Sequence, residues 1–139
     1  GVRGKGDKNM AIQSYRDLAA WQVSMKLAES CYRFTEEFPK TELFGLAAHI
    51  RKSAVSIPSN IAEGHGRRSR AAYAAFVSIA MGSQAELETQ IELARRLEYG
   101  KETRAVELLE TAGEVGRILN GLRVALANRP DPQVSRLRS

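Results

Sequence analysis

Apolar residues recur along this chain at spacings of three and four, which is the periodicity of an amphipathic helix. No stretch alternates polar and apolar residues for long enough to predict a strand. The helical pattern covers four segments, at about 17–37, 41–64, 69–98 and 101–128. Because the segments are long and their connections are short, we expect an all-α, up-down-up-down antiparallel four-helix bundle over residues 15–128.

Local signals predict where these helices begin and end. Pro39 ends the first, and Thr41 is a candidate N-cap for the second. Gly64-His65-Gly66 supplies a stop for the second helix, and Ser69 is placed to cap the third. In the first helix, Trp21 and Tyr32 fall on a stripe assigned to the core, as Phe76 does in the third, so few aromatic side chains remain for stacking on nucleic-acid bases.

The second segment carries three kinds of surface. One apolar stripe is assigned to the core and consists of Leu43, Leu46, Ile50, Ala54, Ile57 and Ile61. Beside it lies a small polar stripe, interpreted as a structural hydrogen-bond network of Ser53, Ser56, Asn60 and Glu63, with His49 at its start. The far side is again apolar, with Ala48, Val55, Pro58 and Ala62.

This surplus of apolar surface predicts a homo-oligomer. The first half of the third helix, residues 71–85, has no formal charge on any face, and a lone four-helix bundle exposes one side of each helix. The simplest way to bury this apolar surface is to pack it against a second copy of the chain. The expected interface consists of Ala48, Val55, Pro58, Ala62 and Ala75.

The net charge of +5 is concentrated in the flanks, with +3 over residues 1–16, zero over 17–128 and +2 over 129–139. Residues 1–14 and 129–139 lack apolar periodicity and are expected to be flexible tails; Met10 is a candidate start, with residues 1–9 left from cloning or from an upstream start. A single cysteine, Cys31, allows no internal disulfide and fits a reducing compartment. No targeting or membrane-spanning segment is apparent, so we expect a cytoplasmic protein without a membrane partner.

Four short sequence motifs in the chain resemble those of a known family. They are YRDLAAWQ (15–22), FP (38–39), SIPSNIAEG (56–64) and IAMGSQAELETQ (79–90). The chain is similar to the "four helix bundle protein" family, first met as open reading frames in intervening sequences of large-subunit ribosomal RNA genes. The resemblance is close over residues 15–99 and extends to the fourth helix by pattern alone. It implies a ring, a pentamer, and kinship with the accessory variability proteins of diversity-generating retroelements, which associate with a reverse transcriptase and nucleic acid. It implies no catalytic activity.

The sequence gives little indication of a catalytic or metal-binding site. The two histidines, His49 and His65, have no partners at ligand spacing, so no metal or cofactor is expected. Gly64-His65-Gly66 follows a helix, whereas dinucleotide-binding loops follow a strand. A small-molecule or hydrolytic role around Asn60, Glu63 and His65 remains an alternative to the structural network.

Basic residues give the strongest functional signal. They gather at two poles of the predicted bundle and comprise Arg51, Lys52, Arg67, Arg68, Arg70, Arg95 and Arg96. Clustered arginines at the start of a helix provide both donors and positive potential for phosphate. We therefore expect a non-enzymatic, homo-oligomeric scaffold whose basic rims bind RNA or DNA. The alternatives are arginines that merely pair with neighbouring glutamates, and a protein-protein adaptor that uses the apolar surface of the second and third helices.

Overall fold

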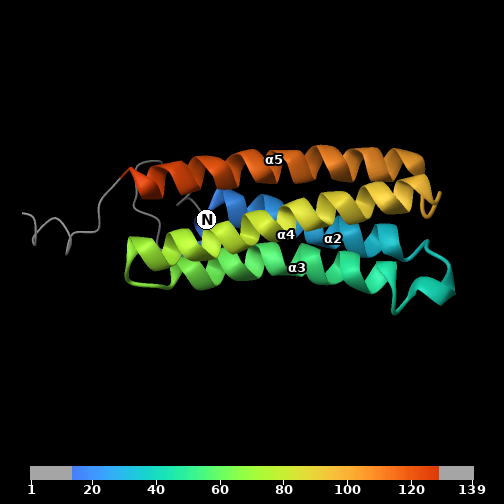
Figure 1. The fold of residues 1–139 in the computed structure, drawn as a ribbon, viewed down its shortest axis with the longest axis horizontal. Coiled ribbons are helices and arrows are strands. Elements are labelled where there is room, and N and C mark those ends of the chain that lie inside the picture. The colour runs from blue at the N-terminus through green and yellow to red at the C-terminus, as the bar shows by residue number, and fades with distance from the viewer. Residues whose placement is uncertain (1–13, 129–139) are drawn as a thin grey trace, which may run out of the picture.

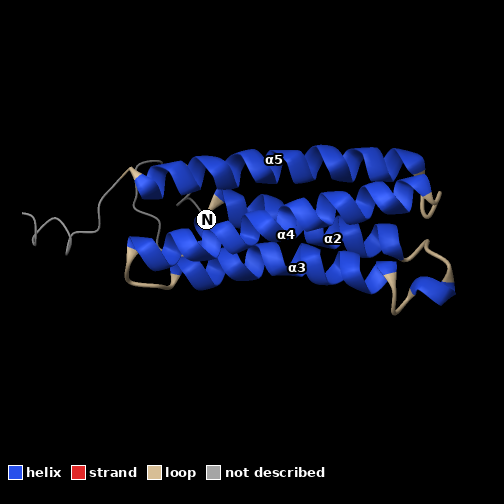
Figure 2. Ribbon diagram, in the orientation of Figure 1, coloured by secondary structure: helices blue, strands red, loops and turns tan. Residues whose placement is uncertain are grey.

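The computed structural model describes residues 14–128. Four long helices run antiparallel to their neighbours: α2 (Ala19–Thr35), α3 (Leu46–His65), α4 (Arg70–Arg96) and α5 (Glu102–Ala127) (Figure 1). Two 3-10 turns precede α2 and α3, at η1 (Tyr15–Asp17) and η2 (Lys40–Glu42), and Figure 2 shows helices and loops without a strand in this part of the chain. The predicted all-α four-helix fold is confirmed.

Each helix packs against two others, α2 against α3 and α5, and α4 against α3 and α5. The described helices on opposite corners, α2 with α4 and α3 with α5, have no Cα atoms within 8 Å of each other, so the bundle is square in section. Its centre is filled by large side chains that are fully buried, among them Leu27, Phe34, Ile50, Ile57, Ile61, Leu87, Ile91 and Leu119. None of the described helices combines the length and hydrophobicity needed to cross a bilayer.

The start of the second long helix differs from the prediction. Thr41 lies in η2 and does not cap α3, which begins five residues later at Leu46. The carboxylate of Glu42 provides the cap, because its Oε1 accepts a hydrogen bond from the backbone N–H of Leu46 at 3.0 Å. Leu43, assigned to the core by its spacing, precedes the helix and is 48% exposed. Its neighbour Phe44 is 91% exposed.

The other helix ends are closer to the expected positions. Ser69 caps α4 as predicted, with its hydroxyl accepting from the N–H of Ala72 at 3.0 Å. Ser14, which the sequence placed in the N-terminal tail, caps η1 by accepting from the N–H of Arg16 at 3.1 Å. The predictions for residues 1–13 and for the tail at 129–139 fall outside the described residues.

Of the three aromatic residues assigned to the core, only Trp21 packs against it, and none is fully buried. Tyr32 is 43% exposed, and Trp21 and Phe76 are only half-buried. The most deeply buried side of α2 is a second stripe with the same three-and-four spacing, formed by Ala20, Ser24, Leu27, Cys31 and Phe34. The stripe with Trp21 and Tyr32 lies at the boundary between core and surface, because Ala28 is buried and Trp21 packs against the core, whereas Tyr32 is exposed.

Candidate nucleic-acid interface

The α3–α4 turn carries three arginines in different environments. The Nη2 of Arg67 lies 3.0 Å from the Oε1 of Glu63, and its guanidinium covers the ring of Phe76, 4.9 Å from the ring centre. Arg68 is exposed and Arg70 is half-buried, and neither forms an ion pair with a carboxylate of residues 14–128. The turn therefore has one neutralised arginine and two that are available for an anion.

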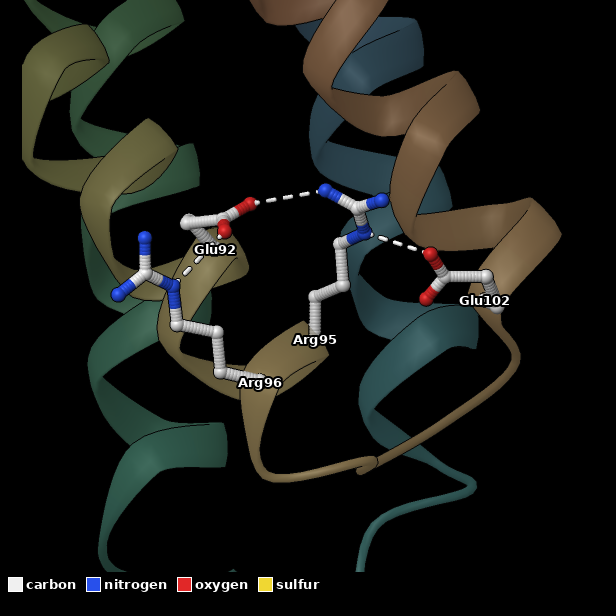
Figure 3. Close-up of polar contacts among 4 residues, drawn as sticks. All are labelled: Glu92, Arg95, Arg96 and Glu102. Atoms are coloured by element: carbon white, nitrogen blue, oxygen red, sulfur yellow. Dashed lines mark hydrogen bonds and ion pairs between the residues drawn. The ribbon is translucent and has the colours of Figure 1, made fainter.

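The second predicted basic pole, Arg95 and Arg96, lies at the opposite end of the bundle and is charge-neutral. Arg95 contacts Glu92 at 3.4 Å and Glu102 at 2.6 Å, and Arg96 contacts Glu92 at 3.0 Å. Figure 3 shows Arg95 between the two carboxylates, joining the end of α4 to the start of α5. Hydrogen bonds from Arg96 and then Arg95 lower the pKa of Glu92, and Glu102 raises the pKa of Arg95.

Arg51 and Lys52 lie near the start of α3, on the same half of the bundle as Arg95. Arg51 is occupied structurally: its Nε donates to the Oγ1 of Thr35 at 2.8 Å, and its guanidinium covers the ring of Tyr32 at 4.8 Å. Lys52 is exposed. The structure thus separates the seven candidate residues, and the arginines of the α3–α4 turn are the group that it keeps together.

Charge is distributed unevenly along the bundle. The midpoints of the four helices define a turn half, containing the α3–α4 turn (14–27, 56–83 and 115–128), and an opposite half (28–55 and 84–114). In the turn half, Asp17 and Glu63 are outnumbered by seven basic residues, Arg16, Lys26, Arg67, Arg68, Arg70, Arg117 and Arg123, for a net charge of +5. The opposite half holds twelve glutamates and eight basic residues, for a net charge of −4. The described bundle therefore has one basic end rather than two.

A polar cluster ties α3 to α4. The hydroxyls of Ser56 and Ser83 are 2.7 Å apart, and the side-chain amide of Asn60 donates to the carbonyl and the hydroxyl of Ser56 at 2.8 and 3.0 Å. Ser53 is buried beside this cluster without joining its hydrogen bonds. Glu63 lies outside the cluster, because its carboxylate pairs with Arg67.

Asn60, Glu63 and His65 do not form a joint acid-base site. Asn60 bonds to Ser56, Glu63 pairs with Arg67, and the His65 ring packs edge-on against Tyr73 with ring centres 5.9 Å apart. Nor does the described part of the chain bring three or more histidine, cysteine or acidic side chains together where they could hold a metal ion.

An apolar groove lies between α2 and α3, with a volume of about 550 Å³. Among the residues that line it are Tyr15, Trp21, Met25, Tyr32, Val55, Pro58 and Ala62. A second hollow shares Tyr32 and Val55 with it and adds Leu43, Phe44 and Ala48. Four of the five predicted interface residues therefore line one continuous surface; the fifth, Ala75, is exposed on α4.

Sequence reasoning missed the α2 wall of this groove. The sequence did contain an indication of this wall. The first helix has two apolar stripes, whereas a helix at the corner of a small bundle needs only one of them for the core. The stripe with Trp21 and Tyr32 was the surplus one.

Comparisons with known proteins identify relatives of the chain. The profile of the 23S rRNA-intervening sequence protein family matches residues 16–121. No significant match is found among curated proteins. A crystal structure described as a protein with unknown function from the S23 ribosomal protein family of Bacteroides thetaiotaomicron is 24% identical in sequence. It covers 76% of this chain and 98% of its own, with a TM-score of 0.68, and so supports the fold. The chain belongs to the 23S rRNA-intervening sequence protein family, as its sequence motifs predicted.

Proposed function

We propose that this protein is a non-enzymatic, homo-oligomeric scaffold that binds RNA or DNA through the basic turn half of each subunit. The observation that carries this proposal is the separation of charge, with +5 on the turn half against −4 on the opposite half. Nucleic-acid backbones are bound largely by electrostatic contacts to phosphate, which require a basic surface and no catalytic site.

The separation is large enough for the two halves to act independently. A helix of 27 residues, the length of α4, spans about 40 Å, whereas charges in physiological salt are screened over about 8 Å. A phosphate at the α3–α4 turn is therefore shielded from the excess of glutamates at the other end.

The groove between α2 and α3 supports self-association. Trp21, Tyr32 and Val55 leave apolar area exposed in a single subunit, and burying such area is the main driving force of protein association. A ring, which the family resemblance suggests is a pentamer, would repeat the α3–α4 turn around one rim. Repetition raises the avidity for a long polyanion without any new type of contact. We further propose a cytoplasmic location, which suits the free thiol of Cys31, and a nucleic-acid enzyme such as a reverse transcriptase as a protein partner.

The test is binding of a fluorescent single-stranded RNA at several salt concentrations. We expect the affinity to fall by a factor of at least about 10³ between roughly 50 and 500 mM salt, because bound phosphates release counterions. Replacing Arg67, Arg68 and Arg70 together by alanine should reduce binding strongly. Binding that is unchanged by salt, or by this triple substitution, would contradict the proposal.

A protein-protein adaptor is the second candidate. Phe44, 91% exposed beside the second hollow, favours it, since an aromatic side chain in that position is a typical anchor in a protein interface. Light scattering on the purified chain separates the two functions: a stable monomer that does not bind RNA supports the adaptor.

A further inference from the structure

Arg68 and Arg70 are not the only arginines of the turn half without an acidic partner among residues 14–128. Arg123 on α5 donates from its Nη2 to the neutral amide oxygen of Asn120 at 2.8 Å, and no carboxylate of residues 14–128 pairs with it. Arg70 on α4 is likewise without such a partner. Both guanidinium groups keep donors for an anion.

Helix geometry places these two arginines on the facing sides of α4 and α5. Gln84 of α4 donates to the carbonyl of Ala112 at 2.9 Å, and a side chain at Gly116 would meet the Gln84 amide at 2.9 Å, so these residues mark the contact. Arg70 lies two heptads before Gln84, and Arg123 lies one heptad after Gly116, which keeps both close to that contact face.

The two positions are also close along the bundle axis. Counting about 1.5 Å per residue from the Gln84 contact, Arg123 lies roughly 14 Å and Arg70 roughly 21 Å toward the α3–α4 turn. An axial offset of about 7 Å is within the reach of two extended arginine side chains.

The two helices that carry these arginines supply no negative charge in this region. The first sixteen residues of α4, 70–85, and the last thirteen of α5, 115–127, contain no aspartate or glutamate. Two nearby guanidinium groups in such a setting repel each other, and a bound phosphate lowers that energy.

We infer that the phosphate-binding surface extends from the α3–α4 turn onto the α4–α5 face, where Arg70 and Arg123 bind the backbone phosphates of a nucleic acid. This inference rests on the proposed function and deepens it, because it adds a residue of α5 to the site. The inferred phosphate-binding surface does not include the opposite end of α5, where Lys101 and Arg104 lie among glutamates.

The test compares two double variants that remove the same charge. Arg70→Gln with Arg123→Gln alters the proposed site, and Lys101→Gln with Arg104→Gln is the matched control in the opposite half. The probe is a labelled oligouridylate of about 20 nucleotides, titrated by fluorescence anisotropy from about 50 to 200 mM salt. We expect about a tenfold loss of affinity and a salt slope reduced by about 2 for the first variant, and a change within about twofold for the control.

Further arms distinguish the outcomes. Arg70→Lys with Arg123→Lys keeps the charge and should restore most of the affinity, while circular dichroism checks that every variant folds. Equal losses in the two double variants, or no loss in the first, would overturn the inference. If the Arg67, Arg68 and Arg70 triple variant loses binding but Arg123→Gln alone leaves affinity and salt slope unchanged, the inference fails while the proposed function stands. If the unmodified protein does not bind the oligonucleotide, or sediments only with phosphatidylserine vesicles, the inference and the proposed function both fail.

Discussion

Gly64 sets how closely two helices approach. The sequence suggested that it helps to end the second helix, but it is buried inside the last turn of α3, and the helix continues to His65. A Cβ at this position would lie 2.7 Å from the Cβ of Phe76 and 3.1 Å from the Tyr73 ring. The missing side chain therefore allows α3 and α4 to pack closely beside the basic turn.

Gly64→Ala should destabilise the protein. Forcing a methyl group against the Cβ of Phe76 costs about 1–3 kcal/mol, of which the better helix propensity of alanine recovers at most about 1 kcal/mol. Gly121→Ala is the control, because a Cβ there meets nothing within 4 Å, and it should raise stability by about 0.5–1 kcal/mol. Urea unfolding of both variants measures the difference. Equal effects would contradict the close approach at Gly64.

The second prediction at the residue scale concerns Cys31, which has no exposed surface. Burial raises its pKa from 9.0 to about 12. The unfolded chain therefore loses this proton near pH 9 while the folded chain keeps it, and folding becomes less favourable as the pH rises. Relative to Cys31→Ala, the free energy of unfolding of the native protein should fall by about 1.4 kcal/mol per pH unit above pH 9. Denaturant titrations measure the free energy of unfolding of both proteins at each pH. If the two profiles against pH are parallel, the thiol is exposed in the folded chain and the prediction is wrong.

At the scale of elements, the connection between α4 and α5 shows why its arginines are not free. The sequence predicted a break at Tyr99-Gly100, and the chain turns there with left-handed φ angles of 61° at Glu98 and 72° at Gly100. The backbone N–H groups of Glu98 and Tyr99 bond back to Arg95 and Ala94 at 3.0 and 2.9 Å, closing the end of α4. This tight turn brings Glu102 within reach of Arg95, and the local positive charge is cancelled.

This corner should depend on pH and salt. Because the pKa of Glu92 is lowered in the folded chain, its ion pairs stabilise the protein above its ordinary pKa of 4.5, and that contribution disappears as the pH falls through the folded value. Glu92→Gln should therefore be less stable than the native protein at neutral pH and equal to it in acid. Glu107→Gln, an exposed glutamate without an ion pair among the described residues, is the control and should show no such trend. Thermal unfolding at several pH values provides the measurement, and high salt should shrink the difference.

At the scale of the whole molecule, the apolar groove and the basic turn half lie on one rigid bundle. The groove lies between α2 and α3, while the arginines without a carboxylate partner among residues 14–128 lie on the α3–α4 turn and on α5. The proposed self-association through the groove would therefore leave the arginines of the turn and the α4–α5 face open to a polyanion.

Val55→Asp should break the proposed assembly into smaller species. A carboxylate in the groove remains solvated in a free subunit, since Val55 is 42% exposed, but loses its water in an interface. Val124→Asp is matched in exposure at 41% and lies outside the groove, so we expect it to keep the native mass. Multi-angle light scattering with and without RNA gives the masses. A native protein that is already monomeric would remove the ring from the proposed function.

The sequence by itself determined the number of helices, their order and most of the core, because these follow from a periodic pattern and from short connections. It also identified the family. Only the tertiary structure decided which side of α2 is buried most deeply, that Glu102 crosses the turn to neutralise Arg95, and that α4 packs against α5 at Gln84, Ala112 and Gly116. Periodicity fixes the side of a helix on which a residue lies, whereas the charge available to a ligand depends on partners from other helices. Those partners depend on how the helices pack together, and the spacing of residues within one helix does not reveal that packing.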